Sequence, residues 1–289
     1  MAGSLKKYTT TFDHHYSQVR SALANATLHE WVVVLVEGDD DLPVYEPLFI
    51  SSKVLVKPAP EENGVRGCRY VELVTRRIAS ELPDAQLIGI RDADYTPWIS
   101  SYTPHPNVFR TEERDMEMML LRSEQVRADL EKVEQGATAK FEWVRDHICV
   151  PRGRMRLLSE VLDLRCSFKE KARISNLWVN KTLCADWSTR MESDFIHNCT
   201  GQYNEHKFTV ADYNREVSLK RLTECPWYKI CQGHDTLSAL QYQMTDTGIN
   251  VEVIMDQMKT SYSVTDFHQT QLYRDLSLFS QQRNWYILK

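Results

Sequence analysis

A run of six apolar residues, most of them β-branched, extends from Trp31 to Val36. Uninterrupted runs of this kind are typical of strands that are buried on both faces of a parallel sheet. Three shorter apolar segments predict further strands, at residues 54–56, 86–90 and 107–110. The chain therefore alternates short buried strands with longer connecting segments.

Helical patterns lie between and after these strands. Four apolar residues recur at the spacing of one helix face: Val71, Val74, Ile78 and Leu82. Residues 16–28 and 116–121 are predicted as two further helices, and the sequence after them is mainly helical by pattern. Strands that alternate with helices require crossover connections, which favour a parallel sheet.

We therefore predict an α/β fold with two domains. A mostly parallel sheet flanked by helices, together with the N-terminal helix, is expected in residues 1–122. A mainly helical domain for substrate binding, dimerisation or both is expected in residues 123–289.

Acidic residues follow three of the predicted strands. They are Glu37, Asp39, Asp40 and Asp41 after the first strand, Asp92 and Asp94 after the third, and Asp115 and Glu117 after the fourth. Parallel strands bring their carboxyl ends to one rim of a sheet, where open α/β sheets bind ligands. Carboxylate oxygens at such a rim suit Mg²⁺, which keeps several waters and leaves room for substrate phosphates.

Simpler interpretations exist for some of these acids. The first cluster also fits a solvated acidic turn that leads into a helix. Asp115 and Glu117 stand at the start of a helix, where negative charge is stabilised without a metal. Asp92 and Asp94 directly follow an apolar strand, and helix capping explains that position less well.

Composition narrows the class of protein. The chain has 289 residues, 26% of them charged, and a net charge of -5, which argues against a general nucleic-acid coat protein. No apolar run reaches the roughly 18 residues that span a bilayer, and the start resembles no export signal, so no membrane association is expected. The seven cysteines include no CxxC pair, which favours a reduced, cytoplasmic protein.

These motifs carry a family resemblance. An apolar strand that ends in Glu37-Gly38 with Asp41 three residues later, followed by Asp92-x-Asp94 after another strand, resembles the Toprim fold. The segments VEGDDDLPVYE, IRDAD and TEERDMEMMLL, with a later Gly-His-Asp, resemble a narrower group. This group comprises the standalone Toprim nucleases related to the OLD family, including the nuclease effectors of PARIS anti-phage systems. The likeness covers about the first 120 residues.

The resemblance implies roles for individual residues. Glu37 would be the catalytic acid or base and a metal ligand, and Asp92 and Asp94 would be catalytic and hold Mg²⁺, with Mn²⁺ as an alternative ion. Asp41, Asp115 and Glu117 would support metal binding. The implied activity is hydrolysis of phosphodiester bonds by a toxic defence effector, since topoisomerases and primases carry further domains.

The same resemblance implies partners. Effectors of this group are understood to be held by an ABC-type ATPase subunit and to cleave host tRNA as homodimers after release. The chain contains no GxxxxGK[ST] phosphate-binding loop, so any step driven by ATP is expected to come from another subunit.

A basic segment is the candidate for substrate binding. Residues 140–181 contain ten Lys or Arg and five acids. Phosphate contacts are predicted for Arg152, Arg154, Arg156, Lys169, Lys171 and Arg173, and a substrate contact for His234. Each also fits an ordinary role, as a solvated helix face for the basic residues and as a helix cap for His234.

Two other functions fit parts of the sequence. Asp92-Ala93-Asp94-Tyr95-Thr96 matches the DxDxT motif of haloacid dehalogenase-like phosphatases, with Asp92 as the nucleophile. That interpretation leaves Glu37 without a role and lacks a later GDxxxD strand end. The second alternative is a non-catalytic Toprim subunit that serves as an interaction platform, which the intact acids argue against.

Overall fold

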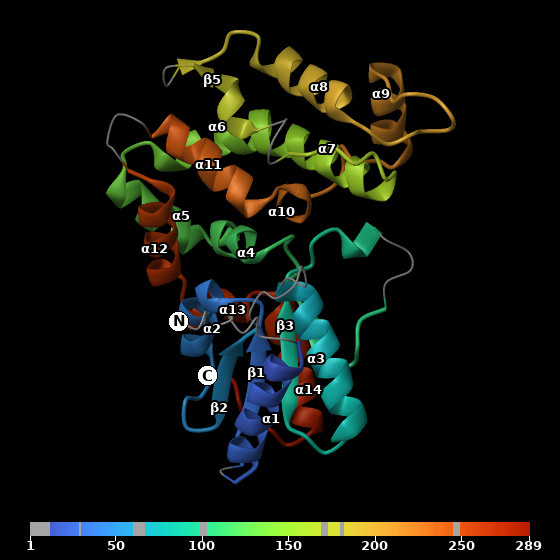
Figure 1. Ribbon diagram of the computed structural model, residues 1–289. Coiled ribbons are helices and arrows are strands. Elements are labelled where there is room, and N and C mark those ends of the chain that lie inside the picture. Colours follow the sequence, from blue (N-terminus) through green and yellow to red (C-terminus); the bar gives the residue numbers. More distant parts are fainter. Residues whose placement is uncertain are drawn as a thin grey trace, which may run out of the picture. The chain divides into compact units, whose positions relative to one another are not determined.

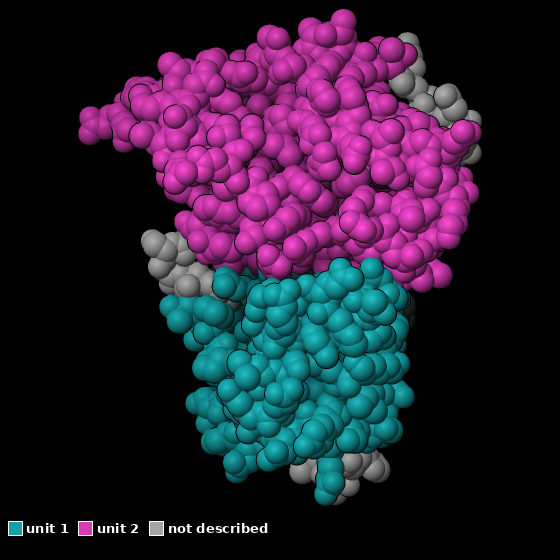
Figure 2. All heavy atoms as spheres, turned by 180° about the vertical axis from the view of Figure 1, so that it is seen from behind, with its two compact units in different colours: residues 1–92, 103–111, 263–289 teal, residues 93–102, 112–262 magenta. Residues whose placement is uncertain are grey.

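The computed structural model describes residues 12–28, 30–59, 67–98, 103–168, 173–179, 182–244 and 249–289. These residues form two compact units, each built from separate chain segments (Figure 2). Unit 1 takes its described residues from 1–92, 103–111 and 263–289, and unit 2 from 93–102 and 112–262. The chain thus passes between the units several times, whereas the sequence prediction divided it once, after residue 122.

The described part of unit 1 contains a four-stranded parallel sheet, as the sequence predicted. Its strands are β1 (Val32–Val36), β2 (Val54–Pro58), β3 (Leu87–Arg91) and β4 (Val108–Arg110), and their order is β2-β1-β3-β4. β1 and β3 are central, and every residue of both is buried. This burial on both faces explains why their sequences are continuously apolar up to the strand ends.

Helices cover both faces of this sheet (Figure 1). α1 (Phe12–Leu28) and α3 (Gly67–Glu81) pack on one face, where Leu23 and Val74 join a core with Val33, Leu87 and Val108. α14 (Gln271–Gln282) lies on the other face, since Phe279 contacts the ring of Phe109, and neighbouring residues of a strand point to opposite sides.

The remaining elements of unit 1 are short. They are η1 (Asp39–Asp41), α2 (Leu42–Tyr45), η2 (Glu46–Leu48) and α13 (Val264–His268). An isolated bridge between Phe49 and Leu288 ties the C-terminal segment to η2 and the chain that follows it. The last residues of the sequence therefore belong to the same unit as the first strands.

Unit 2 is largely helical, as predicted. Its longer helices are α4 (Met116–Arg122), α5 (Glu124–Val133), α6 (Ala137–Val144), α7 (Val150–Val161), α8 (Trp187–Asn198), α9 (Val210–Leu219), α11 (Gly233–Gln243) and α12 (Val251–Ser261). Its short elements are η3 (Thr96–Trp98), η4 (Arg145–Cys149), η5 (Ile174–Leu177), α10 (Trp227–Ile230) and the strand pair β5 (Trp178–Val179) and β6 (Thr182–Leu183). Across the ranges given above, no helix combines the length and the apolar character needed to cross a lipid bilayer.

Candidate functional site

Glu37 and Asp92 meet at the carboxyl ends of the two central strands. Glu37 follows the last residue of β1, Asp92 follows the last residue of β3, and these strands are parallel neighbours. The Oε1 atom of Glu37 accepts a hydrogen bond of 2.8 Å from the backbone N–H of Asp92. Both residues are partly exposed, so their carboxylates lie at the rim of the sheet and outside its core. This is the arrangement that the two strand-end motifs predicted.

Gly67, the first residue of α3, packs directly against Glu37. A Cβ atom at this position would lie 2.8 Å from both the Cβ and the backbone oxygen of Glu37. Any side chain would therefore displace Glu37 or the start of the helix. No local pattern in the sequence indicates this role of Gly67, because only the fold brings residues 37 and 67 together.

The acidic loop after Glu37 has its own local structure. One carboxylate oxygen of Asp41 accepts a hydrogen bond of 2.9 Å from the N–H of Gly38, and this contact closes the turn that begins η1. Asp39 and Asp40 are exposed. The structure therefore gives Asp41 a capping contact, and its predicted support of a metal stays a prediction.

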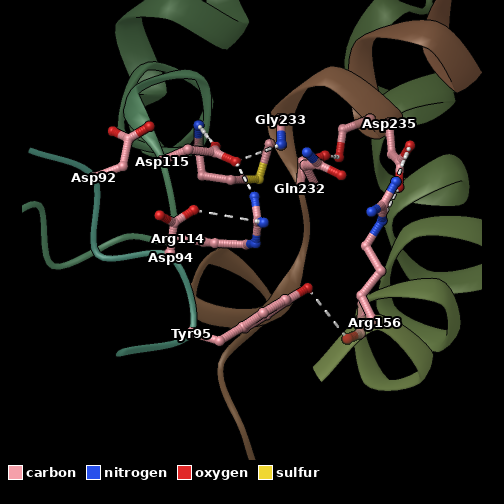
Figure 3. Close-up of polar contacts among 12 residues, drawn as sticks. Asp92, Asp94, Tyr95, Arg114, Asp115, Arg156, Gln232, Gly233 and Asp235 are labelled. Carbon is pink, nitrogen blue, oxygen red and sulfur yellow. Dashed lines mark hydrogen bonds and ion pairs between the residues drawn. The ribbon is translucent and has the colours of Figure 1, made fainter. Parts of the chain in front are cut away.

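Asp94 adopts a backbone conformation that few residue types tolerate. Its φ of 48° is in the left-handed region, where Asp and Asn are favoured over most side chains. Its N–H donates to the backbone oxygen of Arg114 at 2.8 Å, and the guanidinium of Arg114 lies 3.7 Å from its carboxylate. These contacts to Arg114 fix Asp94 in unit 2, with 39% of its side chain exposed (Figure 3).

A cavity of about 270 Å³ adjoins Asp94 within unit 2. Its lining includes Trp98, Glu112, Arg114 and Lys229. A cavity beside a partly exposed carboxylate gives a ligand access to Asp94.

Asp115 is buried and caps α4. Its carboxylate accepts hydrogen bonds from the N–H of Met118 (3.1 Å), from the N–H of Gly233 (2.9 Å) and from Arg114 (2.7 Å; Figure 3). Burial raises the pKa of Asp115, and the positive charge of Arg114 opposes this shift. Three donors already satisfy this carboxylate, so the structure gives Asp115 a positioning role, with α4, α11 and Arg114 held together around it. Glu117 is partly exposed in the first turn of the same helix.

The Gly-His-Asp segment begins α11. A Cβ atom on Gly233 would overlap the Cβ of Glu117 and lie 2.8 Å from a carboxylate oxygen of Asp115, so the close approach of α11 to α4 requires glycine. His234 is exposed, and Asp235 is buried. The substrate contact predicted for His234 stays a prediction.

Asp235 binds two arginines of α7. Arg152 donates to it through Nε at 2.7 Å, and Arg156 through Nε at 2.6 Å and Nη2 at 3.1 Å. Burial alone would raise the pKa of Asp235, but the two guanidinium groups outweigh burial and hold it below its usual value.

The other predicted phosphate contacts lie elsewhere. Residues two apart on a helix point to different sides, so Arg154 turns away from Arg152 and donates to the backbone oxygen of Leu222. Arg152 is almost completely buried. Arg173 is exposed at the start of η5, and Lys169 and Lys171 lie outside the described residues.

Within the described residues, no three His, Cys, Asp or Glu side chains form a ready-made metal cluster. Glu37 and Asp92 nevertheless suit Mg²⁺, which often uses only one or two carboxylates together with water and substrate oxygens. No protein-family model matches the chain, and comparison with curated proteins finds no significant relative.

The substitution Gly233→Ala should destabilise unit 2 by about 1–3 kcal/mol, because the added methyl group must displace Glu117 and Asp115. The measurement is the free energy of unfolding in urea. Gly38→Ala is the matched control, since nothing lies within 4 Å of the methyl group that it adds. Equal stability of the two variants would contradict the close packing of α11 on α4.

Proposed function

We propose that this protein is a Mg²⁺-dependent nuclease of the Toprim type that hydrolyses phosphodiester bonds in RNA. The observation that carries the proposal is the hydrogen bond between Glu37 and the N–H of Asp92 at adjacent carboxyl ends of parallel strands. Asp94 follows Asp92 by two residues, so the chain supplies a third carboxylate immediately after this pair.

Glu37 is the proposed proton carrier. Its carboxylate is oriented by the N–H of Asp92, and it lies at the rim, where water and substrate have access. In this role it takes a proton from the attacking water or returns one to the leaving oxygen.

Asp92 and Asp94 are the proposed ligands of Mg²⁺, with Mn²⁺ as an alternative. A bound Mg²⁺ would stabilise negative charge on the phosphoryl oxygens and favour ionisation of the attacking water. Arg114 positions Asp94, through both its backbone oxygen and its guanidinium. Asp115 holds Arg114 in turn, at 2.7 Å, and its predicted support of a metal stays a prediction.

The biological setting is proposed from the sequence resemblance alone. In this setting the protein is a toxic effector in anti-phage defence that cleaves host tRNA, acts as a homodimer and is controlled by an ABC-type ATPase subunit. Co-purification with the product of a neighbouring ATPase gene would test the last of these points.

The proposal is tested by incubating the purified protein with tRNA, single-stranded DNA, duplex DNA and para-nitrophenyl phosphate. We expect cleavage of RNA with Mg²⁺ or Mn²⁺ and none with EDTA, because the phosphoryl charge then lacks its counterion. Release of para-nitrophenol that depends on Asp92 would instead favour the phosphatase alternative. Inactivity toward all four substrates in the presence of metal would favour the non-catalytic alternative.

A further inference from the structure

A second cavity, of about 310 Å³ and with a mainly polar lining, lies within unit 2. Its lining comes from the segment after β3, the segment before α4, helix α7 and the chain that follows α7, and it includes Tyr95, Arg114, Arg156, Ser159, Glu160 and Ser167. Two arginines and two serines line one small space. This combination of donors is suited to an anion.

Arg156 has donor capacity left for a ligand. Its Nε and Nη2 atoms bind Asp235. Its Nη1 atom has no protein acceptor within the described ranges. The atom is also accessible from outside the protein. The guanidinium also lies 4.4 Å from the ring centroid of Phe168, which restricts its orientation. Arg156 is therefore a fixed donor that opens onto the cavity.

Ser159 supplies a second donor. Its Oγ atom accepts a hydrogen bond of 3.1 Å from the N–H of Cys166, which leaves the hydroxyl hydrogen to donate. No protein acceptor for that hydrogen is present in the part of the chain that the structure describes. Ser159 is buried, so an acceptor for its hydroxyl must come from within the cavity or from water.

Arg114 connects this cavity with the one beside Asp94, because it lines both. Its Nε atom is buried and has no hydrogen-bond partner within the described residues.

One acid opposes anion binding. Glu160 lines the same cavity, but its residue is exposed, so water screens its charge. Asp235 faces Arg152 and Arg156 and already shares its two oxygens between them.

We propose that this cavity binds a phosphate group through Nη1 of Arg156 and the hydroxyl of Ser159. The identity of the phosphate rests on the proposed nuclease function. Under that function, the phosphate belongs to the backbone of an RNA strand that continues past Arg114 toward Asp94. The alternative source of the same chemistry is a free phosphate compound.

The test measures binding of two probes in EDTA, so that no cleavage occurs. The first is inorganic phosphate, followed by calorimetry, and the second is a short single-stranded RNA, followed by fluorescence anisotropy. Ser167→Asp introduces a carboxylate into the cavity, and Ser159→Ala removes one donor. Ser159→Ala should weaken phosphate binding by about tenfold or more, the worth of a hydrogen bond to a charged group, and Ser167→Asp should weaken it by a similar factor through charge repulsion.

The matched control is Ser188→Asp, which changes the charge by the same amount at an exposed position of α8 and should bind both probes like the wild type. A thermal unfolding curve for each variant separates loss of binding from loss of fold. Glu160→Gln should tighten phosphate binding, since it removes the opposing charge.

Three outcomes decide the proposal. Weaker binding of both probes by the cavity variants supports a strand phosphate. Weaker binding of phosphate alone supports the cavity as a site for a free phosphate compound and overturns the strand assignment. Phosphate binding that is absent from the wild type, or equal in the wild type, Ser167→Asp and Ser159→Ala proteins, overturns the site. These binding experiments contain no metal, so they do not depend on cleavage. Failure of the nuclease proposal would be seen separately, as absence of RNA cleavage in the presence of Mg²⁺.

Discussion

Replacing Glu37 with glutamine should leave a folded protein that cleaves RNA about 10²- to 10⁴-fold more slowly than the wild type. Glutamine keeps the size of the side chain and an oxygen that accepts the N–H of Asp92, but it cannot carry a proton in this way. The measurement is the single-turnover rate with Mg²⁺ at saturating protein, together with a thermal unfolding curve.

Asp39→Asn is the matched control for this experiment. Asp39 belongs to the same acidic loop and is exposed, so its replacement changes the charge without touching the contact between Glu37 and Asp92. Asp92→Asn should also slow cleavage strongly, but through weaker metal binding, which calorimetry with Mg²⁺ measures directly. A folded Glu37→Gln protein with wild-type activity would refute the role of Glu37 as the proton carrier. It would favour the phosphatase alternative, in which Glu37 has no role.

The second large effect concerns folding. Replacing Asp235 with asparagine should lower the free energy of unfolding by about 3–5 kcal/mol at neutral pH, because it leaves Arg152 and Arg156 without the carboxylate that both of them bind. Urea unfolding measures this loss. Asp163→Asn is the control, since Asp163 pairs with Arg165 on the exposed surface and its removal should hardly alter stability.

The effect of Asp235 should depend on pH with a defined sign. Its pKa in the folded protein lies below the usual value of 3.8, which applies to the unfolded chain. The carboxylate therefore contributes stability above about pH 4, and this contribution is lost as the pH falls through the folded pKa. The difference between wild type and Asp235→Asn should be constant from pH 5 to 7 and should narrow below about pH 4. A difference that grows on acidification would contradict the ion pairs.

Sequence reasoning succeeded where neighbouring residues decide the structure. The apolar runs around Val34 and Ile88 can be buried on both sides only in the middle of a sheet, and parallel pairing follows from the helices between strands. Once the strands are parallel, Glu37 and Asp92 must end at the same rim, so their meeting was also predictable.

The sequence was less informative where one type of residue fits two environments. An arginine-rich segment suggests phosphate contacts. Its sequence is the same whether the arginines face solvent or pair with a carboxylate. Arg152 and Arg156 bind Asp235, which lies 83 and 79 residues further along the chain, and no local pattern indicates that pairing. The acid of the third motif, Asp115, was likewise compatible with a metal and with a helix cap; it caps α4 through the N–H of Met118 and also accepts from Gly233 and Arg114, which are not local contacts of the helix.

The sequence by itself thus determined the strands, the parallel sheet and the rim that presents Glu37 and Asp92, because the apolar runs and the helical segments between them are local patterns. Only the tertiary structure decided which glycines permit close approach, as at Gly67 and Gly233, and which charges are neutralised. It also decided that residues 263–289 complete the first unit, with Phe279 packed on Phe109 of the sheet. These features depend on contacts between distant segments, whose free energy is gained only when the whole unit assembles.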